Sequence, residues 1–366
     1  MSVFLLSFLA SLVITMLVIR YQRLHGWFSA DSDLAGVQKF HDLPVPRIGG
    51  LGIFVAVLLA MFWRLFENAS VAGFGLVLLV AALPAFGFGF VEDVTKRVGV
   101  SVRLLATAVS AALAGWLLGA WLPSLQIFGV DTLMAAYPWL AIVITCFAVA
   151  GVANAFNIID GYNGLSAMVG VIILGGIAYV AFQLADFHIM IAALGLMGAL
   201  LGFLVWNYPR GLIFLGDGGA YFVGFWIAEL SVLLTARHPE VSKWFPLLLC
   251  FYPIFETLFT IYRRVFVLRT HPGMPDAAHL HQIIYKRLVR WAVGSSLPQD
   301  RVIRNALTAP YLWVLTSVTV IPAVLFWRYA WVLQIFALLF AVGYVLLYRM
   351  IVRFKTPRWL TMNSRR

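Results

Sequence analysis

The sequence predicts an all-α polytopic integral membrane protein with about 11 transmembrane helices, and its composition is the main reason. Hydrophobic residues make up 63% of the 366 residues, charged residues make up 11%, and the mean hydropathy is +0.94. A soluble globular domain has about 45–50% apolar and about 25% charged residues. A helix needs about 20 apolar residues to cross a bilayer, so most of this chain is used in crossings. We therefore expect residues 1–366 to form a single transmembrane domain.

Apolar runs bounded by charged residues, Pro, Gly and Asn mark the expected spans in order. They are residues 2–19, 48–63, 71–90, 102–121, 138–155, 164–184, 189–206, 219–235, 244–262, 309–327 and 329–348. These runs are too long for barrel strands, and lipid leaves backbone groups no water to bind, so the spans are expected to be helices. The first run has no Lys or Arg before it and Arg20 after it, which favours an uncleaved span over a secretory signal.

Basic residues are distributed unequally between the two sides of these spans. Of the 26 Lys and Arg residues, 22 fall in the odd-numbered connections and the C-terminal tail, and the other 4 are Arg64, Arg237, Lys243 and Arg328. The positive-inside rule then predicts an N-terminus outside and a C-terminus in the cytoplasm, in the inner (plasma) membrane. Topology thereby explains the net charge of +11, and no nucleic-acid partner is expected.

Four acidic residues stand at the predicted cytoplasmic ends of spans. Glu92 and Asp93 end the third span, Asp160 follows the fifth, and Asp217 opens the eighth. Carboxylates on a basic face suit a divalent cation that holds polyphosphate, because Mg²⁺ prefers hard oxygen ligands and basic side chains neutralise the remaining phosphate charge. Each carboxylate alone is equally well explained as a helix cap or a solvated turn. Their joint occurrence favours a site.

Glycine-rich turns on the same side strengthen this interpretation. Residues 46–50, 160–164 and 216–219 each place Gly beside a polar group at the start of a helix, where exposed N–H groups favour anions. Glycine in membrane helices more often serves close packing, and that explanation accounts poorly for the adjoining acids and Asn. The three turns therefore add an anion-binding character to the predicted site.

The connection 263–308 is expected to be a long cytoplasmic loop with an HxH motif. His279 and His281 stand two residues apart, and residues 280–289 have the pattern of an amphipathic interfacial helix. Spacing of two puts the histidines on different faces of a helix, so we expect a non-helical turn that contacts phosphate or sugar rather than a zinc site. Glu256 in the ninth span is either a functional carboxylate or a structural partner of the arginines that follow the span.

Taken in order, these motifs resemble those of the polyprenyl-phosphate N-acetylhexosamine-1-phosphate transferases, within glycosyltransferase family 4. That family includes undecaprenyl-phosphate GlcNAc-1-phosphate transferase and phospho-MurNAc-pentapeptide translocase. The likeness runs from about Lys39 to His281. Its elements are KFHDLPVPRIGG, VED with Arg103-Leu104-Leu105, NAFNIIDGYNGL, WNYPRGLIFLGDGGAY, and PIFETLFTIYRR leading to PDAAHLH. Each motif alone is weak, whereas this set in this order is specific.

The resemblance implies a Mg²⁺-dependent enzyme, with Mn²⁺ as the alternative metal. It implies transfer of a HexNAc-1-phosphate from a UDP-HexNAc donor to undecaprenyl phosphate, which releases UMP and initiates a cell-surface polysaccharide such as O-antigen or capsule. Asp217 and Asp160 then match metal ligands, and Glu92, Asp93 and Asp160 match catalytic positions. The positions that match substrate-binding residues are Lys39, Arg47, Asn157, Asn163, Arg210, His279 and His281.

The sequence departs from the family pattern at two positions. Glu92 replaces the usual Asp, and Asn163 stands where many members have a second Asp. The first departure is tolerable, because a phosphate monoester is mostly dianionic at pH 7 and attacks without a general base. Three questions stay open: which UDP-HexNAc is the donor, which pathway the product enters, and whether the protein is a monomer or a homodimer. A lipid or solute transporter and an inactive scaffold are the alternative functions, and the first predicts polar groups near the bilayer midplane.

Overall fold

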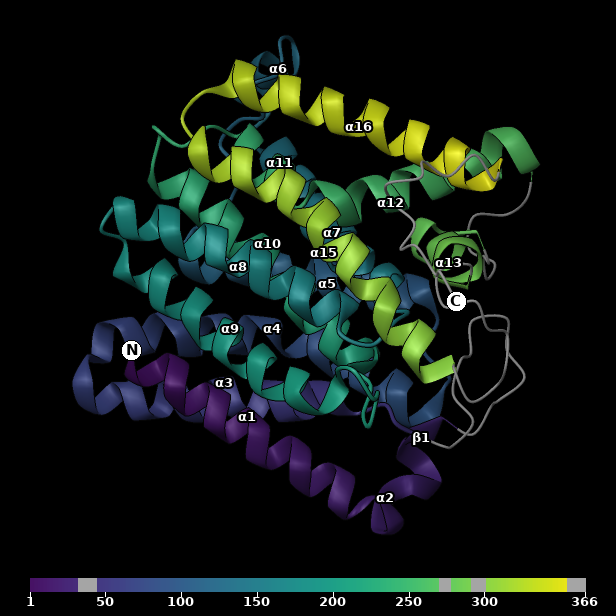
Figure 1. The fold of residues 1–366 in the computed structure, drawn as a ribbon. Coiled ribbons are helices and arrows are strands. Elements are labelled where there is room, and N and C mark those ends of the chain that lie inside the picture. Colours follow the sequence, from purple (N-terminus) through teal and green to yellow (C-terminus); the bar gives the residue numbers. More distant parts are fainter. Residues whose placement is uncertain (32–44, 270–277, 291–300, 354–366) are drawn as a thin grey trace.

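The computed structural model describes residues 1–31, 45–269, 278–290 and 301–353, and in these ranges the protein is a helical membrane bundle (Figure 1). The membrane-length helices are α1 (Ser2–Arg20), α3 (Gly49–Glu67), α4 (Ala69–Thr95), α5 (Val100–Leu118), α7 (Trp139–Ile159), α8 (Leu165–Gln183), α9 (Phe187–Asn207), α10 (Gly216–Arg237), α15 (Arg301–Leu325) and α16 (Ala330–Val352). The shorter helices are α2 (Gln22–Ser29), α6 (Val130–Ala136), α11 (Trp244–Leu249), α12 (Phe251–Tyr262) and α13 (Leu280–Ile283), with π-helical segments η1 (Arg263–Leu268) and η2 (Ile284–Val289). The two-residue strands β1 (Ala30–Asp31) and β2 (Val45–Pro46) pair antiparallel.

Ten helices in the described ranges are long and apolar enough to cross a membrane, which confirms an all-α polytopic protein. They coincide with ten of the eleven predicted spans. The predicted span 244–262 is instead divided into α11 and α12, which meet at Cys250. Pro253 explains the division, because it has no N–H to donate to the carbonyl of Leu249 four residues earlier.

The most enclosed helix is α10, with 94% of its membrane-length window buried by other helices. It contacts α3, α4 and α7, and glycines permit the closest of these approaches. A Cβ atom on Gly50 of α3 would lie 2.3 Å from Gly219 of α10, and one on Gly89 of α4 would lie 2.7 Å from Gly218. Small residues allow such close backbone packing where lipid provides no hydrophobic drive between helices. The start of α10 therefore lies between the ends of its neighbours.

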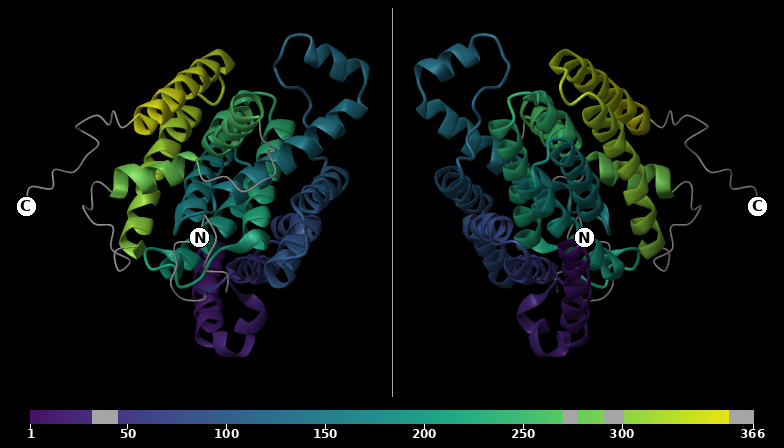
Figure 2. Two further views of the ribbon diagram at one scale, coloured as in Figure 1. Left: turned by 90° about the vertical axis from the view of Figure 1, so that its right-hand side faces the viewer. Right: turned by 90° about the vertical axis from the view of Figure 1, so that its left-hand side faces the viewer.

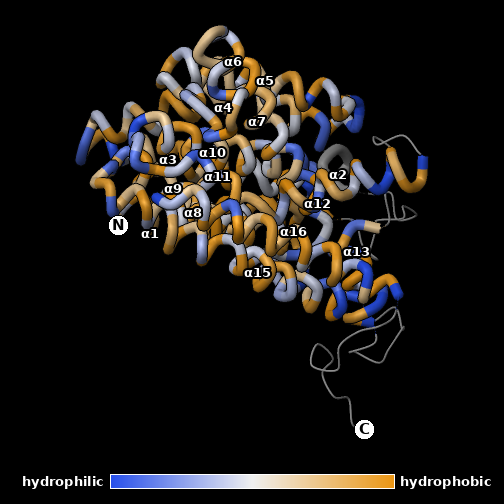
Figure 3. The backbone as a smooth tube through the Cα atoms, turned by 90° about the horizontal axis from the view of Figure 1, so that it is seen from above, coloured by the Kyte–Doolittle hydropathy of each residue, from blue (hydrophilic) through white to orange (hydrophobic). Residues whose placement is uncertain are grey.

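Hydropathy divides the bundle into an apolar body and two more polar ends. Figure 3 shows hydrophobic residues along the helices and hydrophilic residues around α2 and α13 at one end and near the tip of α3 at the other. One connection, which contains α6, projects from the side of the bundle (Figure 2). The ends of α4 and α7 and the starts of α5 and α10 share the end that carries α2 and α13.

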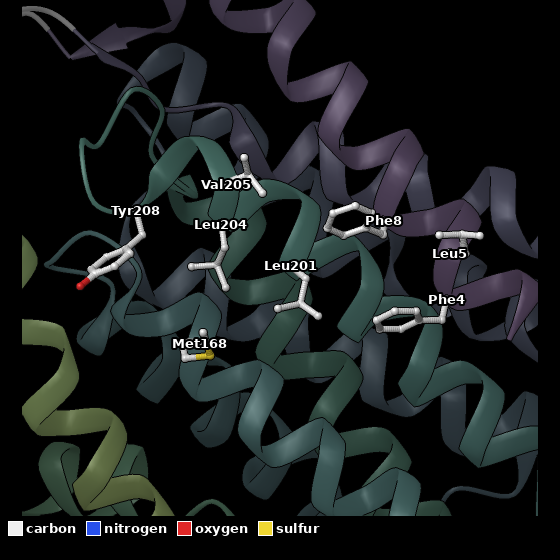
Figure 4. A pocket seen from close by; sticks show the side chains of 8 residues that line it. All are labelled: Phe4, Leu5, Phe8, Met168, Leu201, Leu204, Val205 and Tyr208. Atoms are coloured by element: carbon white, nitrogen blue, oxygen red, sulfur yellow. The ribbon is translucent and has the colours of Figure 1, made fainter.

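An apolar groove faces outward between α1, α8 and α9 (Figure 4). It is lined by Phe4, Leu5, Phe8, Met168, Leu201, Leu204, Val205 and Tyr208. Tyr208 also packs on the turn before α8, where a Cβ atom on Gly164 would lie 2.9 Å from the tyrosine ring. The groove thus ends beside the turn that contains Asp160.

The helical segment predicted over 280–289 forms as α13 followed by η2. Lys286 and Arg290 are exposed on one side of it. Every residue from Leu280 to Tyr285 is buried, and the segment packs on α15 and α16. The amphipathic pattern is thus present, with the apolar face covered by α15 and α16, and the location of the helix at the membrane interface stays a prediction.

Candidate active site

Asp217 lies at the centre of a polar cluster at the start of α10. One carboxylate oxygen accepts a hydrogen bond from the Asn157 side-chain amide of α7. The other forms an ion pair with the Arg103 guanidinium of α5, and Arg47 Nη2 lies 3.9 Å from it. Side chains from three segments distant in sequence thus converge on one carboxylate of α10, and the structure brings together Arg47, Asn157 and Asp217, which the sequence interpretation had grouped.

Asp93 joins the end of α4 to the start of α10. Its two carboxylate oxygens accept backbone hydrogen bonds from Asp217 (2.7 Å) and Gly218 (2.9 Å), and its side chain is 1% exposed. Arg47 Nη2 lies 3.9 Å from the same carboxylate. These bonds satisfy N–H groups that a helix N-terminus leaves without partners. Asp93 therefore fixes the position of Asp217.

Glu92 is directed elsewhere. Its carboxylate accepts a hydrogen bond of 2.6 Å from the backbone N–H of Val98, in the turn between α4 and α5. Consecutive residues of an α-helix point about 100° apart, so Glu92 and Asp93 do not face the same neighbour. The structure brings Asp93 to the cluster and uses Glu92 to close the turn.

Asp160 adds a second carboxylate near Asp217. It follows the last turn of α7, and its pKa is raised to about 7 by burial and by the negative charge of Asp217, against the opposing effect of Arg47. A carboxylate whose ionisation is opposed by a second carboxylate beside it suits a cation that both can share. No set of three or more His, Cys, Asp and Glu residues surrounds a common point in the described ranges. Mg²⁺ does not need one, because it is commonly held by one or two carboxylates, water and substrate phosphates.

The two histidines of the HxH motif are stacked on each other. His279 precedes α13 in an extended conformation and His281 belongs to its first turn, so the rings lie 5.1 Å apart with planes 8° from parallel. His281 also meets the Tyr162 ring edge-on at 5.5 Å, and a Cβ atom on Gly161 would lie 3.4 Å from its Nε2. The motif therefore lies against the turn that follows Asp160, as a non-helical placement of His279 allows.

Two further predicted substrate-binding residues, Asn163 and Arg210, lie in the turns before α8 and after α9. Asn163 is buried; its side-chain amide donates to the Pro209 carbonyl (3.0 Å), and its backbone N–H donates to the Asn305 side chain (2.8 Å). Arg210 is exposed on the turn after α9. Lys39 lies outside the described residues. Asn163 thus joins the turn before α8 to the turn after α9.

The sequence interpretation missed Arg103 as a site residue, although its motif was noted. Arg103 lies in the first turn of α5, is buried, and has its guanidinium 5.4 Å from the centre of the Tyr221 ring. Tyr221 in turn donates a hydrogen bond to Asn154. A buried Arg in a membrane helix needs a partner, so a basic residue inside an apolar span was the available signal.

Comparison with known proteins agrees with the motif pattern. The family model for glycosyl transferase family 4 matches residues 75–235, which include Asp93, Asp160 and Asp217. A probable undecaprenyl-phosphate N-acetylglucosaminyl 1-phosphate transferase of Bacillus subtilis is 30% identical over 292 residues, 76% of this chain and 75% of that protein. An undecaprenyl-phosphate alpha-N-acetylglucosaminyl 1-phosphate transferase of Thermotoga maritima is 27% identical over 254 residues, which are 69% of this chain and 72% of that protein. A decaprenyl-phosphate N-acetylglucosaminephosphotransferase of Mycobacterium tuberculosis is 30% identical, covering 75% and 70%.

Proposed function

The chain belongs to glycosyl transferase family 4, and from that premise we propose that it transfers an N-acetylhexosamine-1-phosphate from a UDP-sugar to undecaprenyl phosphate. The reaction releases UMP and yields a membrane-bound lipid diphosphate sugar. The observation that carries the proposal is the convergence of Asp217, Asp93, Asn157, Arg47 and Arg103 at one end of a membrane bundle. A transporter would instead concentrate its polar groups near the bilayer midplane.

The cluster supplies what phosphoryl transfer between two polyanions needs. Arg47 and Arg103 carry positive charge to a site where two phosphate-bearing substrates have to approach, and they lower the repulsion between them. The lipid phosphate is mostly dianionic at pH 7, so it attacks the donor's β-phosphorus without first losing a proton. Glu92 and Asp93 are therefore not required as proton acceptors, which agrees with their use in closing a turn and capping a helix.

Asp217 and Asp160 are the residues proposed to hold Mg²⁺, or Mn²⁺ in its place. A bound divalent ion would supply Lewis-acid neutralisation of the donor diphosphate. Asn157 orients the Asp217 carboxylate through its amide, and Arg103 balances that carboxylate's charge. His279 and His281 are proposed to contact the donor from the turn beside Asp160.

The position of the site at the ends of the helices suits the acceptor. A polyprenyl phosphate keeps its tail in the bilayer and its phosphate at the interface, so it reaches such a site laterally. We propose that the protein lies in the inner membrane and that this end faces the cytoplasm, where UDP-sugars are made. We further propose that the product begins a surface polysaccharide such as O-antigen or capsule.

The test is UMP release by purified protein. We expect UMP from at least one donor in a panel of UDP-GlcNAc and related UDP-HexNAc, and we expect it to depend on both undecaprenyl phosphate and Mg²⁺. The Asp217→Asn variant should lose at least about 100-fold in turnover, because charge stabilisation is the main contribution to this chemistry. Glu240→Gln is the matched control, since that exposed carboxylate lies beyond the far end of α10. Lipid-independent UMP release, or none from any donor, would refute the proposal.

A further inference from the structure

Glu256 of α12 is fully buried, with 0% of its surface exposed, and the cluster around Asp217 does not use it. Its Oε1 accepts a hydrogen bond of 2.7 Å from the backbone N–H of Leu280, and its Oε2 accepts one of 2.8 Å from the Tyr344 hydroxyl of α16. His279 Nδ1 lies 3.5 Å from Oε1. One carboxylate thus joins α12, α16 and the HxH segment.

A second group of α12 acts on the same histidine. Thr260 is four residues after Glu256 and therefore lies on the same face of the helix. Its hydroxyl oxygen is 3.0 Å from His279 Nδ1. Because Nδ1 is directed at α12 by both groups, any contact of the His279 ring with a substrate has to use Nε2.

The arrangement fixes more than one side chain. With Leu280 N–H and His279 Nδ1 both held by α12, the His279 ring stacks on His281, and His281 rests against Tyr162 and Gly161. The residues after Gly161 are tied in turn to α9, since Gly164 N–H donates to the Asn207 side chain (2.6 Å). The position of Glu256 is thereby transmitted to both histidines and to the turn that begins at Asp160.

A comparison within the chain shows that burial alone does not explain these contacts. Glu229 of α10 is also 0% exposed, yet neither of its carboxylate oxygens has a hydrogen-bond partner in the described residues. Burying a carboxylate in a membrane helix is costly. At Glu256 that cost is offset by bonds to a segment that carries the HxH motif, whereas at Glu229 no such bonds are present.

We propose that Glu256 is a positioning residue for donor binding, which holds the stacked His279–His281 pair against the turn that follows Asp160. This inference rests on the proposed function, because it takes the histidines to contact the UDP-sugar. It predicts that loss of the Glu256 carboxylate weakens the donor's interaction selectively. The lipid acceptor, which enters from the bilayer, should be affected little.

The test compares Glu256→Gln with wild type in the UMP-release assay, with each substrate varied in turn. We expect KM for the UDP-sugar to rise about 10- to 100-fold, as when a group that orients a ligand-binding histidine is removed. KM for undecaprenyl phosphate should change less than about twofold, within the spread of a neutral substitution. Glu229→Gln is the matched control, a substitution of an equally buried carboxylate, and it should leave both KM values at their wild-type level.

A double-mutant cycle separates positioning from general stability. If Glu256 acts through the stacked histidines, then Glu256→Gln should raise the donor KM less in a His279→Ala background than in wild type. Additive effects in the cycle, or equal rises in the KM of donor and acceptor, would overturn the inference. If wild type is active and Glu256→Gln has an unchanged donor KM, the role of Glu256 is refuted and the proposed function stands. If wild type itself has no activity, both the role of Glu256 and the proposed function are refuted.

Tyr344→Phe covers the case in which Glu256→Gln does not fold. This substitution keeps the ring that packs against Phe255 (5.0 Å) and Phe259 (5.4 Å) and removes only the hydroxyl that binds Glu256. We expect a smaller rise in the donor KM, about three- to tenfold, which is the net effect of one typical hydrogen bond. An unchanged donor KM in a folded Tyr344→Phe would count against the inference.

Discussion

Asp217 and Asp160 bring two negative charges into a partly buried site beside Arg47 and Arg103. Burial and the neighbouring Asp217 carboxylate disfavour the ionised form of Asp160, while the Arg47 guanidinium favours it. For Asp160 the opposing effects are larger, and its pKa rises to about 7. A proton therefore competes with any cation for this residue near neutral pH.

This competition predicts a pH-dependent affinity for metal. The ordinary pKa of an Asp is near 3.8, so in metal-free protein the raised value leaves Asp160 mostly protonated below pH 7 and mostly ionised above it. Cation affinity should therefore fall as the pH decreases from 8 to 6, approaching about tenfold per pH unit below the pKa. Loss of the free Mn²⁺ signal in electron paramagnetic resonance measures it.

Two variants separate this effect from a general loss of binding. Asp160→Asn should bind Mn²⁺ more weakly and with a flatter pH dependence. Asp186→Asn should keep the wild-type dependence, because Asp186 caps the start of α9 at the other end of the bundle. Equal pH slopes in wild type and Asp160→Asn would show that Asp160 is not the titrating ligand.

At the level of single residues, the sequence allowed part of the site to be predicted. Asp217, Asn157 and Arg47 were grouped correctly because their motifs stand at ends of spans that share one side. Glu92 was grouped with Asp93 because both end the third predicted span and match the acidic pair of the family. In the structure the Glu92 carboxylate binds the Val98 N–H instead, since adjacent helical residues point in different directions. The contacts of Asn163 with Pro209 and of Arg103 with Asp217 were not predicted, although the place of Arg103 in a membrane helix was a signal for the second contact.

The elements that position the site meet through backbone contacts at the start of α10. Gly216 has a φ of +76°, and a Cβ atom there would lie 1.9 Å from the Arg47 carbonyl oxygen and 2.6 Å from Asp93 Oδ2. Gly50 N–H donates to the Leu215 carbonyl (2.8 Å), so α3 and α10 are also bonded directly. The turn before Asp217 therefore has space only for glycine.

Gly216→Ala should consequently damage both stability and activity. The left-handed conformation alone costs a residue with a Cβ atom about 1–2 kcal/mol, and the contact with Arg47 adds to that cost. We expect a lower melting temperature in a detergent thermal-shift assay and a fall in UMP release of at least about tenfold, because displacement of Arg47 and Asp217 disturbs alignment for transfer.

Gly151→Ala is the control for that substitution. Gly151 lies within α7, and a Cβ atom there would meet nothing within 4 Å. Because Ala favours a helix over Gly, this variant should melt at the wild-type temperature or above it. A Gly216→Ala protein with wild-type melting and turnover would contradict the close packing described at the start of α10.

Hydropathy was sufficient to predict the ten continuous membrane-length helices of the described ranges. It was not sufficient to predict the division of one span into α11 and α12 or the burial of residues 280–285. The apolar run 244–262 has the length of one span, but Pro253 divides it into α11 and α12. The pattern at 280–289 indicated a helix correctly, and the burial of that helix depends on α15 and α16. The burial of this helix thus depends on packing partners that are remote in sequence, which periodicity alone does not reveal.

The whole molecule has two ends that differ in basic charge. Arg64 and Arg237 end α3 and α10, and Lys243 and Arg328 lie in neighbouring connections at the same end. The end with Asp217 and the HxH segment carries Lys and Arg in greater number, including Lys96, Arg97 and Arg290. An excess of basic residues in short connections orients membrane proteins with that side in the cytoplasm.

This asymmetry predicts the orientation of the protein in the cell. Single cysteines would be introduced at Arg97, in the turn beside the site, and at Glu240, beyond α10, after Cys146 and Cys250 are replaced by Ala. A membrane-impermeant thiol reagent applied to intact spheroplasts should label Glu240→Cys, and it should label Arg97→Cys only after permeabilisation. The opposite pattern would place the site outside, where cytoplasmic UDP-sugars do not reach it. Because the donor and most of the basic residues are expected on the same side, that pattern would contradict both the predicted orientation and the proposed use of a cytoplasmic UDP-sugar.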